Sequence, residues 1–195
     1  WQLRRPMMPM RSALGGVKTY FAIPEVSKWV TFVQCEGSWL PGSKVRVVAS
    51  EDFYIFGVLS SSAHRAWADT QKGTLEDRPT YTHTSCFETF PFPQIVAPEL
   101  VQQIRQTMIT LNDYRNEVML ERNWGITDLY NAYFHEPASQ LAKHHKALDA
   151  LVLKAYGWSA KDDVLTNLLD LNLELAELEA DGQGIVGPWD PNSMD

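Results

Sequence analysis

The chain has 195 residues, with 17 Lys and Arg against 24 Asp and Glu, and a formal net charge of −7 at pH 7. Its content of 45% hydrophobic and 21% charged residues is typical of a globular protein and excludes a mainly disordered one. No apolar run reaches the roughly 18 residues of a membrane-spanning helix. Two cysteines far apart, Cys35 and Cys86, do not make a disulfide scaffold. We therefore expect a cytoplasmic protein that contacts no membrane.

Short β-branched and aromatic runs dominate the first half of the chain and predict strands. The four runs are 19–24, 29–34, 45–50 and 54–59. The last two are close enough in sequence to form a hairpin. The cluster 60–62 then offers serine N-caps for a short helix that ends near Asp69.

The segment 70–84 has no clear hydrophobic period and is expected to be a loop. Residues 85–90 predict one more short strand, which Pro91 to Pro93 close because proline resists both helix and central strand.

The second half has the hydrophobic spacing of helices. The predicted helices are 98–122, 127–133, 137–156 and 162–179. The third should have Pro137 in its first turn and Gly157 just past its end. The fold class expected from both halves is α+β. It comprises a twisted, mainly antiparallel β-rich subdomain over 1–97, a helical subdomain over 98–180 and a flexible tail over 181–195.

Charge divides the two halves unequally. Residues 1–97 carry a net charge of +2, whereas residues 98–195 carry −9. An acidic total argues against a nucleic-acid surface, but this asymmetry weakens that argument for the first half alone.

The sequence offers no convincing motif for self-contained catalysis or cofactor binding. Residues 182–187 match G-x-G-x-x-G, but an acidic helix precedes them and Pro188 follows, so we expect a tail. His144 and His145 point about 100° apart on a helix and have no ligand partner at metal spacing. We expect no catalytic, cofactor-binding or metal-binding residues in this chain, and an independent hydrolase has almost no support.

The segment 60–84 holds residue types that read base edges or bind phosphates: Arg and Lys for guanine, Gln for adenine, Ser and Thr for either. An ordinary solvated loop has the same composition, so the alternative stays open. The candidates are Ser61, His64, Arg65, Gln71, Lys72, Thr74, Arg78, Thr80, His83 and Thr84, together with Lys28 earlier in the chain.

Several blocks, in order, resemble the target recognition domain of MmeI-type restriction–modification enzymes, large bacterial proteins with an adenine-N6 DNA methyltransferase core. Residues 84–93, TSCFETFPFP, are similar to the hallmark that closes that domain. Further similar blocks are 19–28, 52–61, 64–67, 111–116 and 148–158. The sequence departs from the family at Ile23 and Glu25, where Thr and Arg are common, and the loss of that Arg removes one candidate phosphate contact. The 70–84 loop follows no shared pattern.

The resemblance implies that this chain is the C-terminal part of a methyltransferase or methyltransferase–endonuclease. It implies double-stranded DNA and the methyltransferase domain of the same polypeptide as partners. S-adenosylmethionine would bind that other domain, so this chain alone should not methylate DNA. Because the sequence begins at Trp1, we also expect a piece of a longer protein.

Two hypotheses follow. In the first, the chain recognises a DNA target, with Lys28 and Arg65 on phosphates and loop residues on bases. In the second, the acidic helices dock the catalytic domain or another protein, and the chain reads no bases. Binding that does not weaken with salt would favour the second.

Overall fold

The structure, a computed structural model, describes residues 8–71, 73–75 and 78–187. The elements in chain order are α1 (Met8–Leu14), β1 (Thr19–Pro24), β2 (Val33–Glu36), β3 (Val45–Val48), α2 (Phe53–Ser60), α3 (Ser62–Gln71), β4 (Gly73–Leu75), β5 (Arg78–Thr80), the π-helix η1 (His83–Phe87), α4 (Pro98–Arg122), α5 (Ile126–His135), α6 (Gln140–Ala155) and α7 (Val164–Ala180). The predicted α+β class is confirmed.

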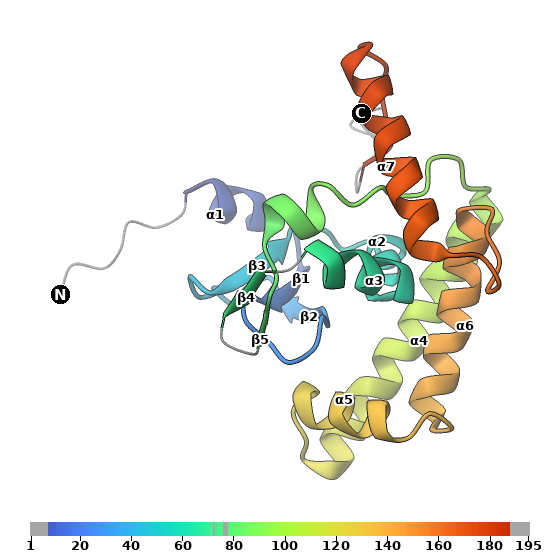
Figure 1. The fold of residues 1–195 in the computed structure, drawn as a ribbon. Helices are drawn as coiled ribbons and strands as arrows, with labels where there is room; N and C mark the ends of the chain where they lie inside the picture. The colour runs from blue at the N-terminus through green and yellow to red at the C-terminus, as the bar shows by residue number, and fades with distance from the viewer. Residues whose placement is uncertain (1–7, 72, 76–77, 188–195) are drawn as a thin grey trace.

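The strands form two small antiparallel units. The first is a three-stranded sheet in the order β2-β1-β3, and the second is the β4–β5 hairpin. Figure 1 shows both units on one side of the molecule, the antiparallel pair α4 and α6 on the other, and α2 and α3 between them. Helix α7 packs on α3 and extends beyond the rest (Figure 1).

One core spans the sheet side and the helices. Phe21 of β1 stacks on Phe56 of α2, with ring centroids 4.3 Å apart. Helix α2 then packs closely on α4 at Gly57, where a Cβ atom would lie 2.8 Å from the Cγ2 of Ile104. Leu148 of α6 is fully buried in the same cluster. The expected division near residue 97 stays a prediction, and hydrophobic packing crosses it.

Two polar links reinforce this junction. Arg105 of α4 binds the carboxylate of Asp52 through two hydrogen bonds of 2.7 and 2.6 Å. Burial would raise the pKa of Asp52, but the hydrogen bonds from Arg105 and from the Tyr54 amide outweigh it and lower this pKa. Arg115 of α4, buried between Phe56 and Tyr130, donates to the Phe32 carbonyl at 2.7 Å.

The helices of the second half are largely as predicted. Helix α4 has the predicted bounds, and Asn123 ends it in the left-handed conformation. Helix α6 begins later than predicted, because Ser139 is its N-cap and Pro137 lies before it. Gly157 follows α6 with φ of +77°, as expected for a C-terminal glycine.

The first half differs from its predictions in three places. Residues 54–59 form α2, not a strand, so they make no hairpin with β3. Asp52 caps this helix, and five consecutive residues of α2 are buried, a pattern that hydrophobic period alone cannot assign. Residues 85–90 contain η1 and a turn, not a strand. Only 33–36 pair as a strand where 29–34 was predicted.

The predicted loop 70–84 and the predicted tail also contain order. β4 and β5 pair antiparallel within that loop. After α7, the Val186 amide donates to Gln94 at 2.8 Å, and the Gln94 amide donates back to the Val186 carbonyl at 2.9 Å. The segment is therefore held at 186, and residues 188–195 of the expected tail lie outside the described residues.

Candidate nucleic-acid interface

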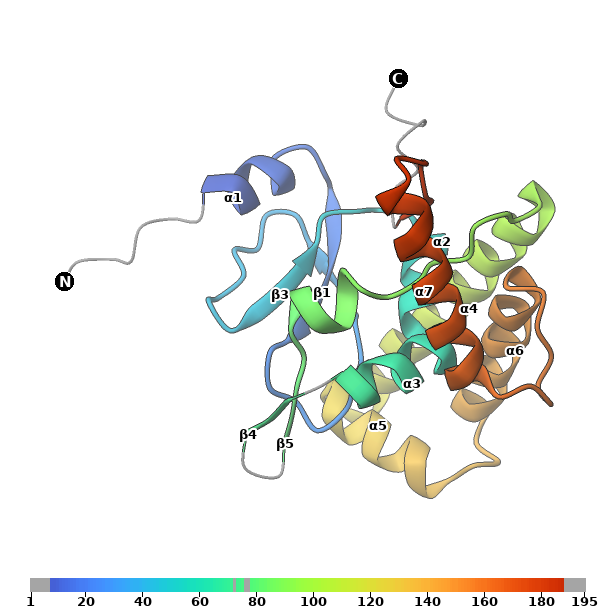
Figure 2. The ribbon, with the colours of Figure 1, turned by 45° about the horizontal axis from the view of Figure 1, so that its top comes forward.

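The β4–β5 hairpin projects from the sheet side of the molecule, as Figure 2 shows. Its register pairs Gly73 with Thr80, Thr74 with Pro79 and Leu75 with Arg78. Three residues per strand cannot make a stable hairpin in water, so contacts at its base must hold it.

The base of the hairpin is tied to the end of β1. Val26 forms an antiparallel bridge with Thr80, and the Tyr81 amide donates to the Glu25 carbonyl at 2.8 Å. The Glu25 carboxylate in turn lies 3.4 Å from the Lys44 amine and 3.2 Å from Arg46. Glu25, which departs from the family pattern, therefore pairs with two nearby cations.

A buried histidine also contacts the base of the hairpin. His64 of α3 has no exposed surface; its Nδ1 lies 2.9 Å from the Leu59 carbonyl and its Nε2 lies 3.1 Å from the Tyr81 hydroxyl. The carbonyl can only accept, so Nδ1 carries the proton and Nε2 accepts from Tyr81. Burial lowers the pKa of His64 to about 4, so the ring is neutral at pH 7. Helix α3 thus positions the exit of β5.

The segments just before and just after the hairpin are also hydrogen-bonded to each other. The Ser85 hydroxyl of η1 lies 3.3 Å from the carbonyl of Gln71, the last residue of α3, and also bonds the Thr82 hydroxyl. Trp67 of α3 donates from Nε1 to Thr89 at 3.3 Å. These bonds fix the orientation of the hairpin at its base.

The structure brings most of the predicted site residues to this region. Gln71, half-buried, precedes the hairpin, and His83 and Thr84 are exposed in η1 directly after it. Thr74, Arg78 and Thr80 belong to its strands. Lys72 lies outside the described residues.

Two of the predicted residues do not face solvent. His64 and Ser61 are 0% and 1% exposed. The Ser61 hydroxyl donates to the Val58 carbonyl at 2.7 Å, at the end of α2. Such burial leaves no surface for a base, so we remove both from the DNA-contacting set and assign His64 to the support of the hairpin.

The remaining two cations lie beside α5. Lys28 is exposed in the connection between β1 and β2, and its amine donates to Asn131 at 2.8 Å. Arg65 is half-buried on α3, with its guanidinium 5.6 Å from the ring centre of Phe134. Sequence reasoning missed Asn131 and Phe134, because neither lies in a run or motif that marks a site.

Alternatives to a binding surface gain nothing from the described residues. No group of three or more His, Cys, Asp or Glu side chains is placed to hold a metal in this part of the chain. His145, which follows His144 in the sequence, is buried, and its Nε2 lies 2.8 Å from the Tyr130 hydroxyl. None of the helices that the structure describes has the length and apolarity to cross a membrane.

Comparison with known proteins gives three matches. The family model for the MmeI target recognition domain matches residues 10–94. DNA methyltransferase A of Bacillus subtilis (strain 168) is 26% identical over 139 residues, which cover 68% of this chain and 15% of that protein. A solved structure of the type IIL restriction–modification enzyme MmeI in complex with DNA has a TM-score of 0.67 at 22% identity, over 83% of this chain and 22% of that chain.

The matched regions fit the geometry described above. The chain spans less than a quarter of the length of either relative. The family-model match includes the sheet, α2, α3, the hairpin and η1 and ends just before α4. The likeness to the MmeI structure extends the shared fold into the helices. Residues 10–94 of this chain are therefore similar to the MmeI target recognition domain.

Proposed function

We propose that this chain recognises a specific sequence in double-stranded DNA and that the β4–β5 hairpin enters the major groove to do so. The observation that carries the proposal is a projecting two-stranded ribbon in a segment that matches a target recognition family. The major groove is wide enough for such a ribbon and gives each base pair a distinct pattern of donors and acceptors.

The chemistry of the ribbon supports base readout. Arg78 could bind guanine through O6 and N7, Gln71 could bind adenine, and Thr74 or Thr80 could bind either base. The anchors at Tyr81 and Val26 hold the ribbon in one orientation, which readout needs because a hydrogen bond discriminates only when its donor is fixed.

The whole protein would be a DNA adenine methyltransferase, with or without cleavage activity. The match to DNA methyltransferase A supports this assignment. In the division of labour that we propose, a separate domain binds S-adenosylmethionine and takes the adenine out of the helix, while this chain selects the site. Such a protein would act on DNA in the cytoplasm.

A second role fits the helices. Leu169 and Leu173 of α7 are 43% and 64% exposed, and acidic side chains surround them. An exposed apolar stripe on an acidic helix is suited to docking a basic surface of another domain. We propose that the methyltransferase domain of the same polypeptide docks there, while the opposite side of the molecule contacts DNA.

The test is a reading of the methylation motif. The full-length protein is expressed in a host without adenine methylation, and N6-methyladenine is mapped in its genome. Residues 72–79 are replaced by a Gly/Ser linker of equal length, which keeps the anchors Tyr81 and Ser85 intact. A motif that relaxes or disappears supports the proposal.

The control replaces exposed residues 159–161 in the connection between α6 and α7 with a Gly/Ser linker of the same length. This change should leave the motif as it is. A motif that survives the hairpin replacement unchanged would contradict base reading by the hairpin and favour the docking role alone.

A further inference from the structure

Two cations flank an aromatic pair where the sheet side meets α5. Trp29 and Phe134 stack with ring centroids 4.0 Å apart and planes inclined by 26°. The Lys28 amine lies 4.9 Å from the Trp29 ring centre, and the Arg65 guanidinium lies 5.6 Å from that of Phe134. We call Lys28, Trp29, Arg65, Asn131 and Phe134 the α5 patch.

Asn131 locks the patch together. Its Oδ1 accepts both the Lys28 amine at 2.8 Å and the Trp29 indole at 3.2 Å. One side chain of α5 thus fixes a cation and a ring that come from the connection between β1 and β2. A lysine held in this way has lost part of its conformational freedom before any ligand arrives.

Packing alone does not account for the patch. Phe134 remains 40% exposed, and Lys28 is exposed although it has an ordered partner. Lys28 forms no ion pair with a carboxylate among the residues that the structure describes. Arg65 interacts electrostatically with Asp149, whose carboxylate also accepts the Ser62 amide at 2.7 Å. Neither Lys28 nor Arg65 forms a close ion pair among the described residues, so both cations retain capacity for an anion.

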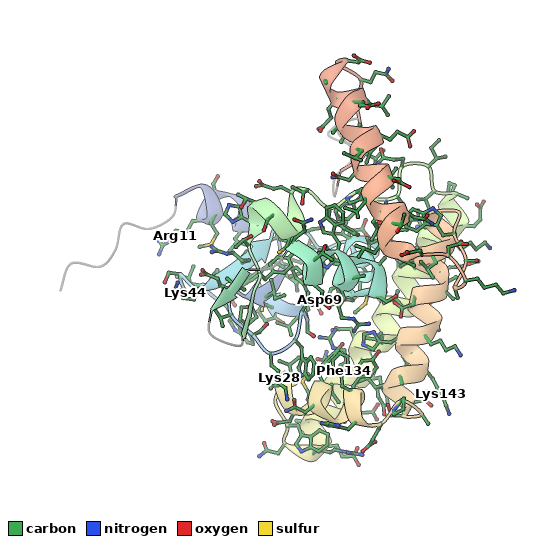
Figure 3. The ribbon with its side chains drawn as sticks, in the orientation of Figure 1. Arg11, Lys28, Lys44, Asp69, Phe134 and Lys143 are labelled. Carbon is green, nitrogen blue, oxygen red and sulfur yellow. The ribbon has the colours of Figure 1, made fainter. Side chains whose placement is uncertain are left out.

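The patch is continuous with the hairpin. Val26, which bridges to Thr80 at the hairpin base, is two residues before Lys28. In Figures 1 and 2 the connection between β1 and β2 lies between the hairpin and α5. Figure 3 shows Lys28 and Phe134 close together on the α5 side. A duplex that meets the hairpin can reach the patch along the same side of the molecule.

We propose that the α5 patch binds the DNA backbone beside the groove that the hairpin enters, with Lys28 and Arg65 on phosphates and the Trp29–Phe134 stack holding both cations in place. This inference rests on the proposed function and extends the DNA surface beyond residues 10–94, into α5. Phosphate contacts fix the register of a protein on the duplex, which a short ribbon cannot do alone. Rings beneath the cations orient them without neutralising them.

The test measures salt dependence. Fluorescence anisotropy follows the binding of the 195-residue chain to a random duplex of about 30 base pairs, from about 50 to 300 mM salt. Lys28→Gln and Arg65→Gln should each reduce the slope of log affinity against log salt by about 1, because each lost phosphate contact releases fewer counterions. Lys161→Gln, an equal charge change in the connection between α6 and α7, should leave the slope unchanged.

The aromatic pair is tested by two matched variants. Phe134→Leu removes the π face and should weaken binding at low salt about two- to fivefold. Phe134→Tyr keeps that face and should bind like the wild type. Thermal unfolding of each variant is measured in parallel, and Lys28→Gln is the main test because Lys28 is exposed and its replacement creates no cavity.

The outcomes separate this inference from the proposed function. The Lys28 and Arg65 variants are compared with the variant that replaces residues 72–79. If the first two keep the wild-type salt slope while the third binds DNA more weakly, the α5 patch is overturned and the hairpin remains as the DNA surface. Unchanged binding in both sets of variants, or no salt-dependent binding by the wild type, would count against both.

Discussion

The α4–α6 pair and the hairpin region are stabilised in different ways. The 25 residues of α4 place a buried stripe against α2 and α6, and helical period gathers these side chains on one face. The hairpin has three residues per strand and depends on bonds from β1, α3 and η1 at its base. The difference separates a rigid support from a small projecting element whose anchoring contacts lie at its base.

The largest effect should come from the core that both regions share. Leu148→Ala removes a fully buried side chain that packs beside Ile104 and Gly57 and should lower the free energy of unfolding by about 2–5 kcal/mol. Hydrogen exchange should show β1 and α6 losing protection together. Leu120→Ala, at an 85% exposed site, should change stability by less than about 0.5 kcal/mol. Protection lost in α6 alone would show that the halves are independent.

Acid should destabilise both regions through buried histidines. Burial lowers the pKa of His64 to about 4 and that of His145, which also faces Arg115, Arg65 and His144, to about 3. The unfolded chain takes up protons near pH 6.5 that the folded chain refuses, so stability falls as pH drops from 6.5 toward 4. Each histidine should lower the free energy of unfolding by about 2 kcal/mol at pH 5.

Urea unfolding at pH 7, 6 and 5 checks this dependence. His145→Gln should remove about half of the pH slope in that window, because one of the two titrating groups is lost. Equal stability at pH 7 and pH 5 in the wild type would contradict neutral, buried histidines in the folded protein.

A smaller loss of stability, largely confined to the hairpin, is expected when its anchor at Tyr81 is weakened. Tyr81→Phe deletes the hydroxyl that donates to His64 and leaves the Nε2 of a buried ring without that donor, at a cost of about 1–3 kcal/mol. Amide exchange should accelerate at Thr80 and Tyr81 more than in α4. Uniform acceleration across the chain would mean that the hairpin anchor is part of the global core.

The smallest effect on stability, with the sharpest effect on recognition, is expected at Arg78. Arg78→Ala should leave the unfolding temperature nearly unchanged but relax one position of the DNA motif, by about 1–3 kcal/mol of discrimination. Motif mapping of the full-length protein measures it. If every position keeps its preference, Arg78 does not read a base.

Helices were the most predictable part of the fold. The sequence predicts α4 with its observed bounds, because apolar residues recur with helical period over seven turns. Residues 54–59 were assigned wrongly because a continuous apolar run fits a buried strand as well as a buried helix. The contacts of α2 with β1 and α4 decide between them, and those partners are distant in sequence.

The candidate site was predictable by location more than by residue. Sequence reasoning placed it in 60–84, where the hairpin lies, and the family match includes that segment. It could not separate exposed His83 and Thr84 from buried His64 and Ser61, because residue type does not report burial. Nor could it find Asn131 and Phe134, which reach the site from a helix about 100 residues after Lys28.

By itself the sequence determined the α+β class, the helices of the second half, the segment of the candidate site and the family resemblance, since each depends on local period or contiguous motifs. Only the tertiary structure decided which of the candidate side chains face solvent, how Tyr81 and Val26 hold the hairpin, and that α5 meets Lys28 and Trp29. The physical reason is that burial and anchoring arise from contacts between distant segments, whose geometry no local pattern contains.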